Sequence, residues 1–204
     1  MNTAPQPPPD IEQRLLPVVE ELLFQHGFNG LNIREVSRSV EMGPATIYKY
    51  FGSKEGLALR VLQDQDQQIA IAIAPHIPAS ASAYAKWKAF YRALLSFYDQ
   101  NPKIAVIQNI AMPTHTWFLP EEKWPVAAVS RIIRRLIEEG RATAELDPAV
   151  TDNQIMAAHY MHFVREVRLW RSRDMGWRLA DRVETFFPVV WKTISAPGAP
   201  SNPP

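Results

Sequence analysis

The chain has 204 residues, of which 47% are hydrophobic and 21% are charged, and its formal net charge is +1. This composition supports a substantial core and excludes a globally disordered chain. The absence of cysteine excludes disulfides, thiolate metal sites and thiol nucleophiles, and no apolar stretch approaches the ~18 residues that span a bilayer. With no charged start followed by an apolar run at its N-terminus, the chain is expected to be cytoplasmic.

Prolines gather at both ends of the chain, and the segments 1–9 and 196–204 are therefore predicted to be disordered Pro-rich tails. Between them most segments have helical periodicity, and none alternates apolar and polar residues over a sustained run. We therefore expect an all-α fold, with an N-terminal domain over residues 10–58 and a larger helical domain over residues 59–195.

The first helix is predicted to begin near Asp10, which fits an N-cap. Pro17 then either kinks the helix or lies in the first turn of a helix that begins later. The sequence HGFNG ends the helix, because Gly27 and Gly30 can adopt the positive φ of a helix terminus.

Two short helices follow over residues 32–51. Asn32 and Glu35 have the spacing of a capping box at the start of the first of them. After a tight turn, Gly43 serves as the N-cap and Pro44 as the first residue of the second. Two short helices that cross steeply leave one of them free to enter a DNA major groove.

The second short helix has an inner and an outer face, because Ile47 and Phe51 are four residues apart and predicted to point inward. Thr46 offers a hydroxyl and a methyl group for a base edge, and tyrosine and lysine side chains suit phosphate oxygens. Residues 31–60 hold five basic and three acidic residues, a local net charge of +2. The residues predicted to bind DNA are Arg34, Ala45, Thr46, Tyr48, Lys49, Tyr50 and Lys54.

Over about residues 11–60 the sequence resembles the TetR family of transcriptional regulators. The resemblance rests on Phe24, Gly27 and Phe28, then on the run TIYKYF (46–51), and then on Ser53, Lys54, Glu55 and Leu57. It implies a one-component regulator, in which a helix-turn-helix domain precedes a larger helical domain that binds a small effector and forms a homodimer. A repressor that leaves a palindromic DNA operator when a largely apolar ligand binds is the expected function, with no catalysis and no cofactor.

The turn between the two short helices departs from the family pattern, because Glu41 stands where glycine is usual and Gly43 where a serine cap is usual. Both changes predict some strain or a weaker cap. They also favour an alternative, a helical interaction scaffold that has lost DNA binding.

The second half of the chain is predicted to hold amphipathic helices at about 83–100, 103–114, 122–141, 152–173 and 177–195. An apolar cavity with a few polar groups is what a small-molecule site requires, although for any single aromatic residue here the core is the better assignment and only the group as a whole favours a pocket. The predicted ligand-binding residues are Trp87, Tyr91, Met112, His115, Trp117, Phe118, His159, His162 and Phe163.

The last two helices, near 152–173 and 177–195, are the candidates for a homodimer interface, as the resemblance implies. Each carries one apolar stripe, and two such helices meeting their symmetry mates form a four-helix interface. The stripes are Ile155, His159, Phe163, Val167 and Trp170, and Leu179, Val183, Phe186, Phe187, Val190 and Trp191.

One further alternative is a helical metal-dependent enzyme. His159, His162 and Glu166 have the spacing of residues on one helix face, which is how metal sites form inside helix bundles.

Overall fold

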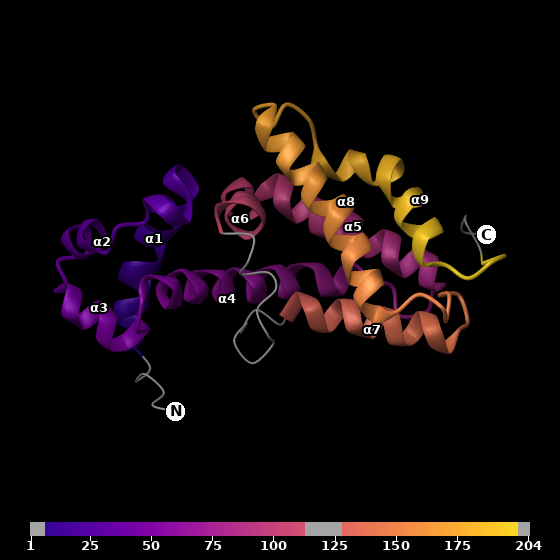
Figure 1. Cartoon of the computed structure of the whole chain (residues 1–204), viewed down its shortest axis with the longest axis horizontal. Coiled ribbons are helices and arrows are strands. Elements are labelled where there is room, and N and C mark those ends of the chain that lie inside the picture. Colours follow the sequence, from indigo (N-terminus) through magenta and orange to yellow (C-terminus); the bar gives the residue numbers. More distant parts are fainter. Residues whose placement is uncertain (1–6, 113–127, 200–204) are drawn as a thin grey trace. The chain divides into compact units, whose positions relative to one another are not determined.

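A computed structural model describes residues 7–112 and 128–199, and within these ranges the fold is all-α (Figure 1). An isolated bridge between Leu146 and Ser195 is the one β-type pairing in the described part of the chain. None of the described helices is both long and apolar enough to cross a membrane.

The described residues form two compact units. The first contains residues 7–66 and 103–112, and the second contains residues 67–102 and 128–199. The helix α4 begins in the first unit and continues into the second. The predicted boundary at residue 58 remains a prediction.

The first half of the chain contains four α-helices and one short 3-10 turn. They are α1 (Pro9–Gly30), α2 (Ile33–Ser39), α3 (Pro44–Phe51), α4 (Lys54–Ile73) and η1 (Ala74–His76). The run IAIAIA before Pro75 is helical, as alanine-rich sequence predicts.

The described helices of the second half correspond to the predicted segments, with shifts at their ends. They are α5 (Ala83–Gln100), α6 (Pro102–Val106), η2 (Ile107–Ala111), α7 (Ala128–Ala142), α8 (Asp152–Ser172), η5 (Leu179–Arg182) and α9 (Val183–Ile194). The segment predicted as one helix over 103–114 is a short α-helix that widens into the π-helical turn η2. The segment predicted over 177–195 begins as the 3-10 turn η5.

The path of α1 differs from the prediction at both ends. Its N-cap is Pro8, so Asp10 lies in the first turn, where its charge favours the helix dipole. The helix contains Pro17 with helical backbone angles, and the break comes at Gly27, whose φ is 65°. A Cβ at Gly27 would also lie 3.6 Å from the Ala111 carbonyl oxygen, whereas Gly30 does not have a positive φ.

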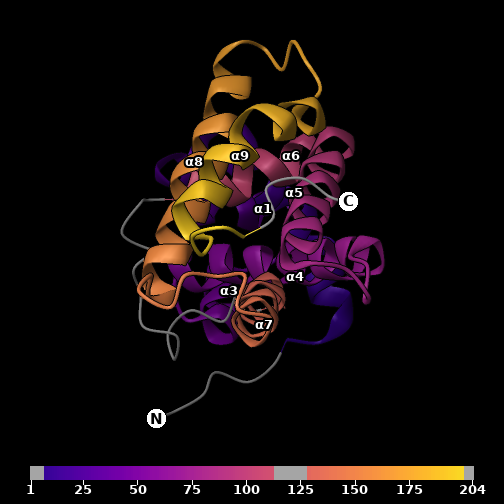
Figure 2. The ribbon, with the colours of Figure 1, turned by 90° about the vertical axis from the view of Figure 1, so that its right-hand side faces the viewer.

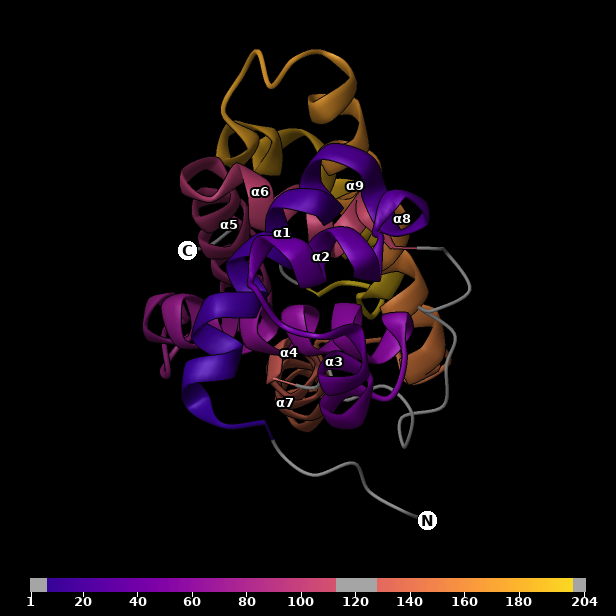
Figure 3. The ribbon, with the colours of Figure 1, turned by 90° about the vertical axis from the view of Figure 1, so that its left-hand side faces the viewer.

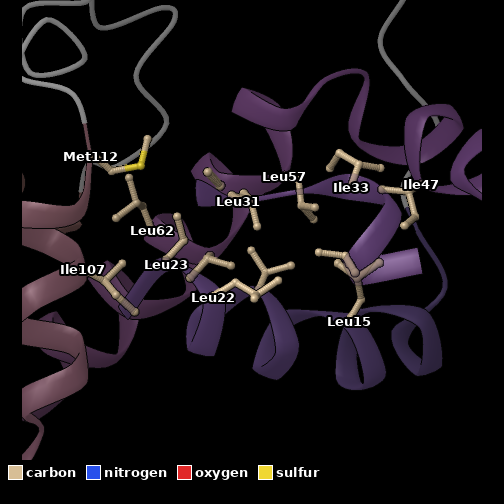
Figure 4. Packing of buried hydrophobic residues seen from close by; sticks show 14 of the residues in the cluster. Leu15, Leu22, Leu23, Leu31, Ile33, Ile47, Leu57, Leu62, Ile107 and Met112 are labelled. Carbon is tan, nitrogen blue, oxygen red and sulfur yellow. The ribbon is translucent and has the colours of Figure 1, made fainter. Parts of the chain in front are cut away.

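The first unit has one hydrophobic core between α1, α2, α3 and the start of α4 (Figures 3 and 4). Leu15, Leu23, Val36, Ile47 and Leu57 are all at most 1% exposed. Each comes from the inward face of its own helix, so the apolar periodicity that defines these helices also builds the core that fixes α3.

The second unit is built around α5, which packs against α7, α9 and η5 (Figure 2). Its core is aromatic. The rings of Tyr84 and Phe187 lie 5.1 Å apart between centroids, and those of Tyr91 and Phe186 lie 5.2 Å apart at right angles. Edge-to-face contacts of this kind stabilise a core beyond the area that they bury.

The apolar stripes of α8 and α9 lie inside this core, so the stripes themselves are not available to a partner, whereas a homodimer through these two helices remains a prediction. Ile155, Phe163 and Trp170 of α8 are at most 4% exposed, and so are Phe187 and Val190 of α9. The two helices pack against each other and against α5 within one chain. A pattern of apolar residues says that a face is buried but not which molecule covers it.

Candidate functional site

The helix α2 is fixed at its N-terminus by a local hydrogen bond. Asn32 Oδ1 accepts from the backbone N–H of Arg34 at 2.9 Å, which satisfies one of the free donors of the first turn. Ile33 and Val36 are buried, and Arg34 is exposed at the start of the helix. The predicted cap residue is therefore confirmed in its role.

The turn between α2 and α3 contains a residue in the left-handed region. Glu41 has a φ of 52°. The backbone N–H of Met42 donates to the Ser37 carbonyl at 3.0 Å, and the Ser37 hydroxyl donates back to the Met42 carbonyl. The strain that Glu41 predicted is therefore present, and Ser37, a buried polar residue of α2, closes the turn around it.

The helix α3 presents one face to the core and one to solvent. Ile47 is 1% exposed, whereas Tyr48 is 47% exposed. Lys49 is also exposed, and its Nζ lies 5.2 Å from the centroid of the Tyr50 ring, which favours the charge through a cation–π contact.

The other predicted residues of this surface are partly covered. Ala45 is exposed, while Thr46 and Tyr50 are half-buried. Phe51, predicted to point inward, is also half-buried and packs on the first unit's core.

Lys54 begins α4 and reaches back to the end of α1. Its Nζ donates to the Asn29 carbonyl at 3.4 Å and lies 4.6 Å from the centroid of the Phe28 ring. Ser53 caps the same helix, since its Oγ accepts from the Gly56 N–H at 3.0 Å. Lys54 is thus half-buried and positioned, and the aromatic partner that positions it was not foreseen from the sequence.

Together these residues form a short helix whose polar and aromatic side chains are exposed on a rigid three-helix support. Residues 16–61 match the family model described as bacterial regulatory proteins of the tetR family. Over these residues the chain is therefore similar to the DNA-binding domain of the TetR family.

Two similar proteins with curated names are HTH-type transcriptional regulators. The chain is 23% identical over 151 residues to the HTH-type transcriptional regulator AlkX of Mycobacterium tuberculosis. The aligned segment covers 71% of this chain and 64% of AlkX. It is 32% identical over 71 residues to the HTH-type transcriptional regulator UidR of Escherichia coli K12. This aligned segment covers 34% of this chain and 35% of UidR. Neither match therefore reaches two thirds of the relative's own length.

Solved structures share the fold over most of the chain. A TetR family transcription regulator from Shewanella sp. PV-4, described as putative, has a TM-score of 0.74 at 18% identity, covering 91% of this chain and 98% of the other. The transcriptional regulator FadR of Bacillus subtilis, solved with stearoyl-CoA, has a TM-score of 0.70 at 13% identity, covering 89% and 98%. The all-α architecture, with a TetR-type N-terminal domain and a larger helical domain, is confirmed.

Four of the predicted ligand-binding residues come together in the second unit. Trp87, Tyr91, His159 and Phe163 are all at most 4% exposed. The Tyr91 hydroxyl lies 3.1 Å from His159 Nδ1, and the His159 ring stacks on Phe163 with centroids 5.3 Å apart. Burial lowers the pKa of His159 to about 3 and raises that of Tyr91. The imidazole is therefore neutral at physiological pH.

One polar atom in this aromatic cluster lacks a partner. The indole Nε1 of Trp87 is buried and finds no hydrogen-bond acceptor among the described residues. An unsatisfied buried N–H costs about 1–3 kcal/mol and calls for an acceptor.

The other predicted ligand-binding residues are not gathered there. Met112 packs in the core of the first unit, and His162 is half-buried on α8. His115, Trp117 and Phe118 lie outside the described residues.

The alternative of a metal site on α8 does not fit the contacts of Glu166. One of its carboxylate oxygens binds Arg165 at 2.5 Å and the other binds Arg182 at 3.0 Å. His159 is already paired with Tyr91, and no group of three or more potential ligands is found among the described residues. The predicted spacing is real, but the carboxylate serves an ion pair.

Proposed function

We propose that the chain is a DNA-binding transcriptional regulator whose domain over residues 10–58 binds an operator through α3. The proposal rests mainly on α3, which is fixed by buried Ile47 and has an exposed opposite face. This helix lies within the segment that matches the family model. A recognition helix must combine these two properties, because base contacts need a rigid helix in the major groove.

Each predicted residue has a role that its position supports. The hydroxyl and methyl groups of Thr46 suit a base edge or a thymine methyl, and Ala45 allows close approach at the exposed start of α3. The hydroxyls of Tyr48 and Tyr50 and the ammonium of Lys49 suit phosphate oxygens. Arg34 and Lys54 flank α3 and extend the phosphate contacts on either side in the sequence.

We further propose that residues 59–195 bind a small, largely apolar effector and that its binding weakens operator affinity, which makes the protein a repressor. The aromatic cluster around Tyr91 and His159 supports an apolar ligand, and the FadR structure with stearoyl-CoA supports ligand binding by this fold. A ligand can shift DNA affinity only by binding the two conformations unequally. The effect is therefore testable as a ligand-dependent change in operator Kd.

The proposed homodimer uses the outward faces of α8 and α9, since their inward faces are occupied. Tyr160 is 38% exposed, Met161 is 74% exposed and Val189 is 52% exposed. Large apolar side chains that remain exposed on adjacent helices mark an interaction surface. A two-fold pair of α3 helices then reads a palindrome with half-sites ~34 Å apart.

The DNA-binding proposal is tested by the affinity of the purified protein for the DNA upstream of its own gene, measured by fluorescence anisotropy over a salt series. Lys49→Ala removes one phosphate contact per protomer, so Kd rises roughly tenfold and the slope of log K against log salt falls by about 1.8 for a dimer. Tyr48→Ala weakens binding without the same change in slope, because tyrosine carries no charge.

The matched control is Arg131→Ala, which removes an equal charge from an exposed position on α7. If this variant and Lys49→Ala lose affinity equally, α3 is not the reading surface. If the wild-type protein fails to bind this DNA at moderate salt, the interaction scaffold that has lost DNA binding becomes the better description.

The dimer is tested by multi-angle light scattering. Met161→Glu places a charge on the proposed interface and is expected to yield monomers, while Glu138→Lys, an exposed change on α7, leaves the dimer intact. A Met161→Glu protein with the wild-type mass would place the interface elsewhere.

A further inference from the structure

A cleft opens in the second unit where α5 ends and where the chain turns from α8 into η5. Its volume is about 540 Å³, within the range of roughly 300–1,000 Å³ that small-molecule sites occupy. Trp170, Trp177 and Met175 line one part, and Ser96, Asp99 and Gln100 of α5 line another. None of the residues predicted to bind an effector lines this cleft.

The apolar wall is held in place by its own contacts. Trp170 is 3% exposed, and its Nε1 donates to the Trp177 carbonyl at 2.8 Å. The turn between the two tryptophans contains Asp174 and Met175, both with φ between 50° and 60°. Two consecutive left-handed residues without glycine are sparsely populated, and such outliers concentrate at functional sites. The part of the cleft that contains the two tryptophans is thus held by a side chain–backbone hydrogen bond and by a turn with a restricted backbone.

The two charged side chains of the cleft differ in how they are engaged. Both carboxylate oxygens of Asp99 accept hydrogen bonds, from the backbone N–H groups of Leu179 at 2.6 Å and Ala180 at 3.0 Å. The guanidinium of Arg178, in contrast, makes no hydrogen bond or ion pair within residues 7–112 and 128–199. Arg178 is therefore the charged group of the cleft whose donors remain available to a ligand.

The other polar groups of the cleft can donate as well. The Ser96 hydroxyl and the Gln100 amide are without partners in the described part of the chain. The Trp177 Nε1 is buried and has no acceptor there either. An arginine fork beside several neutral donors is the arrangement that binds carboxylates.

We propose that this cleft is a binding site for a planar aromatic carboxylate, whose ring packs on Trp177 and Trp170 and whose carboxylate pairs with Arg178. The claim concerns the second unit alone and does not depend on DNA binding. It adds a ligand class and a ligand site to the chain that are separate from the aromatic cluster around His159.

The test uses the full chain and three probes of nearly equal shape, measured by isothermal calorimetry. They are 2-naphthoate, its neutral carboxamide, and 2-naphthylmethylammonium. We expect 2-naphthoate to bind at least tenfold more tightly than the carboxamide and the cation not to bind measurably. Equal affinity for the acid and the amide would overturn the proposed role of charge, and preference for the cation would show that Asp99 governs the site.

Two arginine variants localise the site. Arg178→Gln is expected to weaken 2-naphthoate binding at least tenfold, whereas Arg173→Gln, an exposed arginine of the same turn, changes it less than twofold. Equal losses in the two variants would indicate a diffuse charge effect and contradict the site.

A spectroscopic measurement distinguishes binding in the cleft from any loss of fold. The chain has six tryptophans, and their indole N–H signals can be followed by ¹⁵N NMR. Trp177→Phe identifies the signal of Trp177, which is expected to move on addition of 2-naphthoate. If the Trp87 signal moves instead, the ligand occupies the aromatic core and the proposal fails.

Discussion

Replacing Glu41 by glycine is expected to stabilise the helix-turn-helix. Glu41 has a φ of 52°, and holding a residue with a Cβ in this left-handed region costs roughly 1–2 kcal/mol. Glycine adopts the region freely but loses more backbone entropy on folding, and this loss offsets roughly 0.5–1 kcal/mol of the gain. The net expectation is that Glu41→Gly is more stable than the natural chain by roughly 0.5–1 kcal/mol.

The matched control is Glu41→Ala, which removes the same charge but retains the Cβ. Because its backbone strain remains, it should unfold near the natural chain and below Glu41→Gly. The comparison separates backbone conformation from electrostatics, which matters because Glu41 is exposed and lies three residues before α3, the helix proposed to bind DNA. Both variants lose the repulsion between the Glu41 carboxylate and the DNA phosphates, so both are expected to bind operator DNA more tightly.

The assay must report on the first unit, because a global signal averages over both units. Hydrogen–deuterium exchange of peptides spanning residues 31–51 gives the local opening free energy of α2 and α3. Slower exchange in Glu41→Gly than in Glu41→Ala is expected. If the two variants exchange alike, the left-handed residue is not strained and the assignment of its cost is refuted.

Three further changes test the cores. Removing the Ser37 hydroxyl in Ser37→Ala deprives the Met42 carbonyl of a donor and should cost about 1 kcal/mol in urea unfolding. Tyr91→Phe leaves buried His159 Nδ1 without its partner at 3.1 Å and should cost about 1–3 kcal/mol. The pKa of His159 falls to about 3 on folding, so below pH 6.5 the unfolded chain binds a proton that the folded chain does not. Stability should therefore fall by about 1.4 kcal/mol per pH unit, about 2 kcal/mol by pH 5, and His159→Gln should flatten this dependence.

The helix-turn-helix could be predicted in detail because its signals are local. Asn32 caps α2, Ser53 caps α4 and Gly27 takes a positive φ, each within a few residues of the structure that it determines. Glu41 could be recognised as a departure because the family that the sequence resembles usually has glycine there, and the structure confirms a left-handed residue at this turn. The compensation by Ser37 was missed, since a hydroxyl in a helix gives no sign of its acceptor.

The second unit was less predictable because its contacts join residues far apart in sequence. Glu166 and His159 have the spacing of ligands on one helix, yet their partners are Arg182 and Tyr91 from other helices. Trp177, which lines the cleft, was not singled out from the sequence. Hydrophobic periodicity identifies which face of a helix is buried, but it does not say which residues of other helices contact that face.

The apolar stripes of α8 and α9 show what this limitation means for assembly. The prediction assigned these stripes to an interface with a second copy of the chain, whereas residues such as Phe163 and Val190 are buried in the core of their own chain. What remains outward is sparse, with Met161 at 74% and Val189 at 52% exposure the most apolar positions. In an interface built on so few exposed apolar side chains, most of the binding energy comes from those side chains, because the contacts around them mainly exclude water. The proposed homodimer should therefore be sensitive to single substitutions at Met161 and Val189, even though the helices that carry them are packed into the core on their other faces.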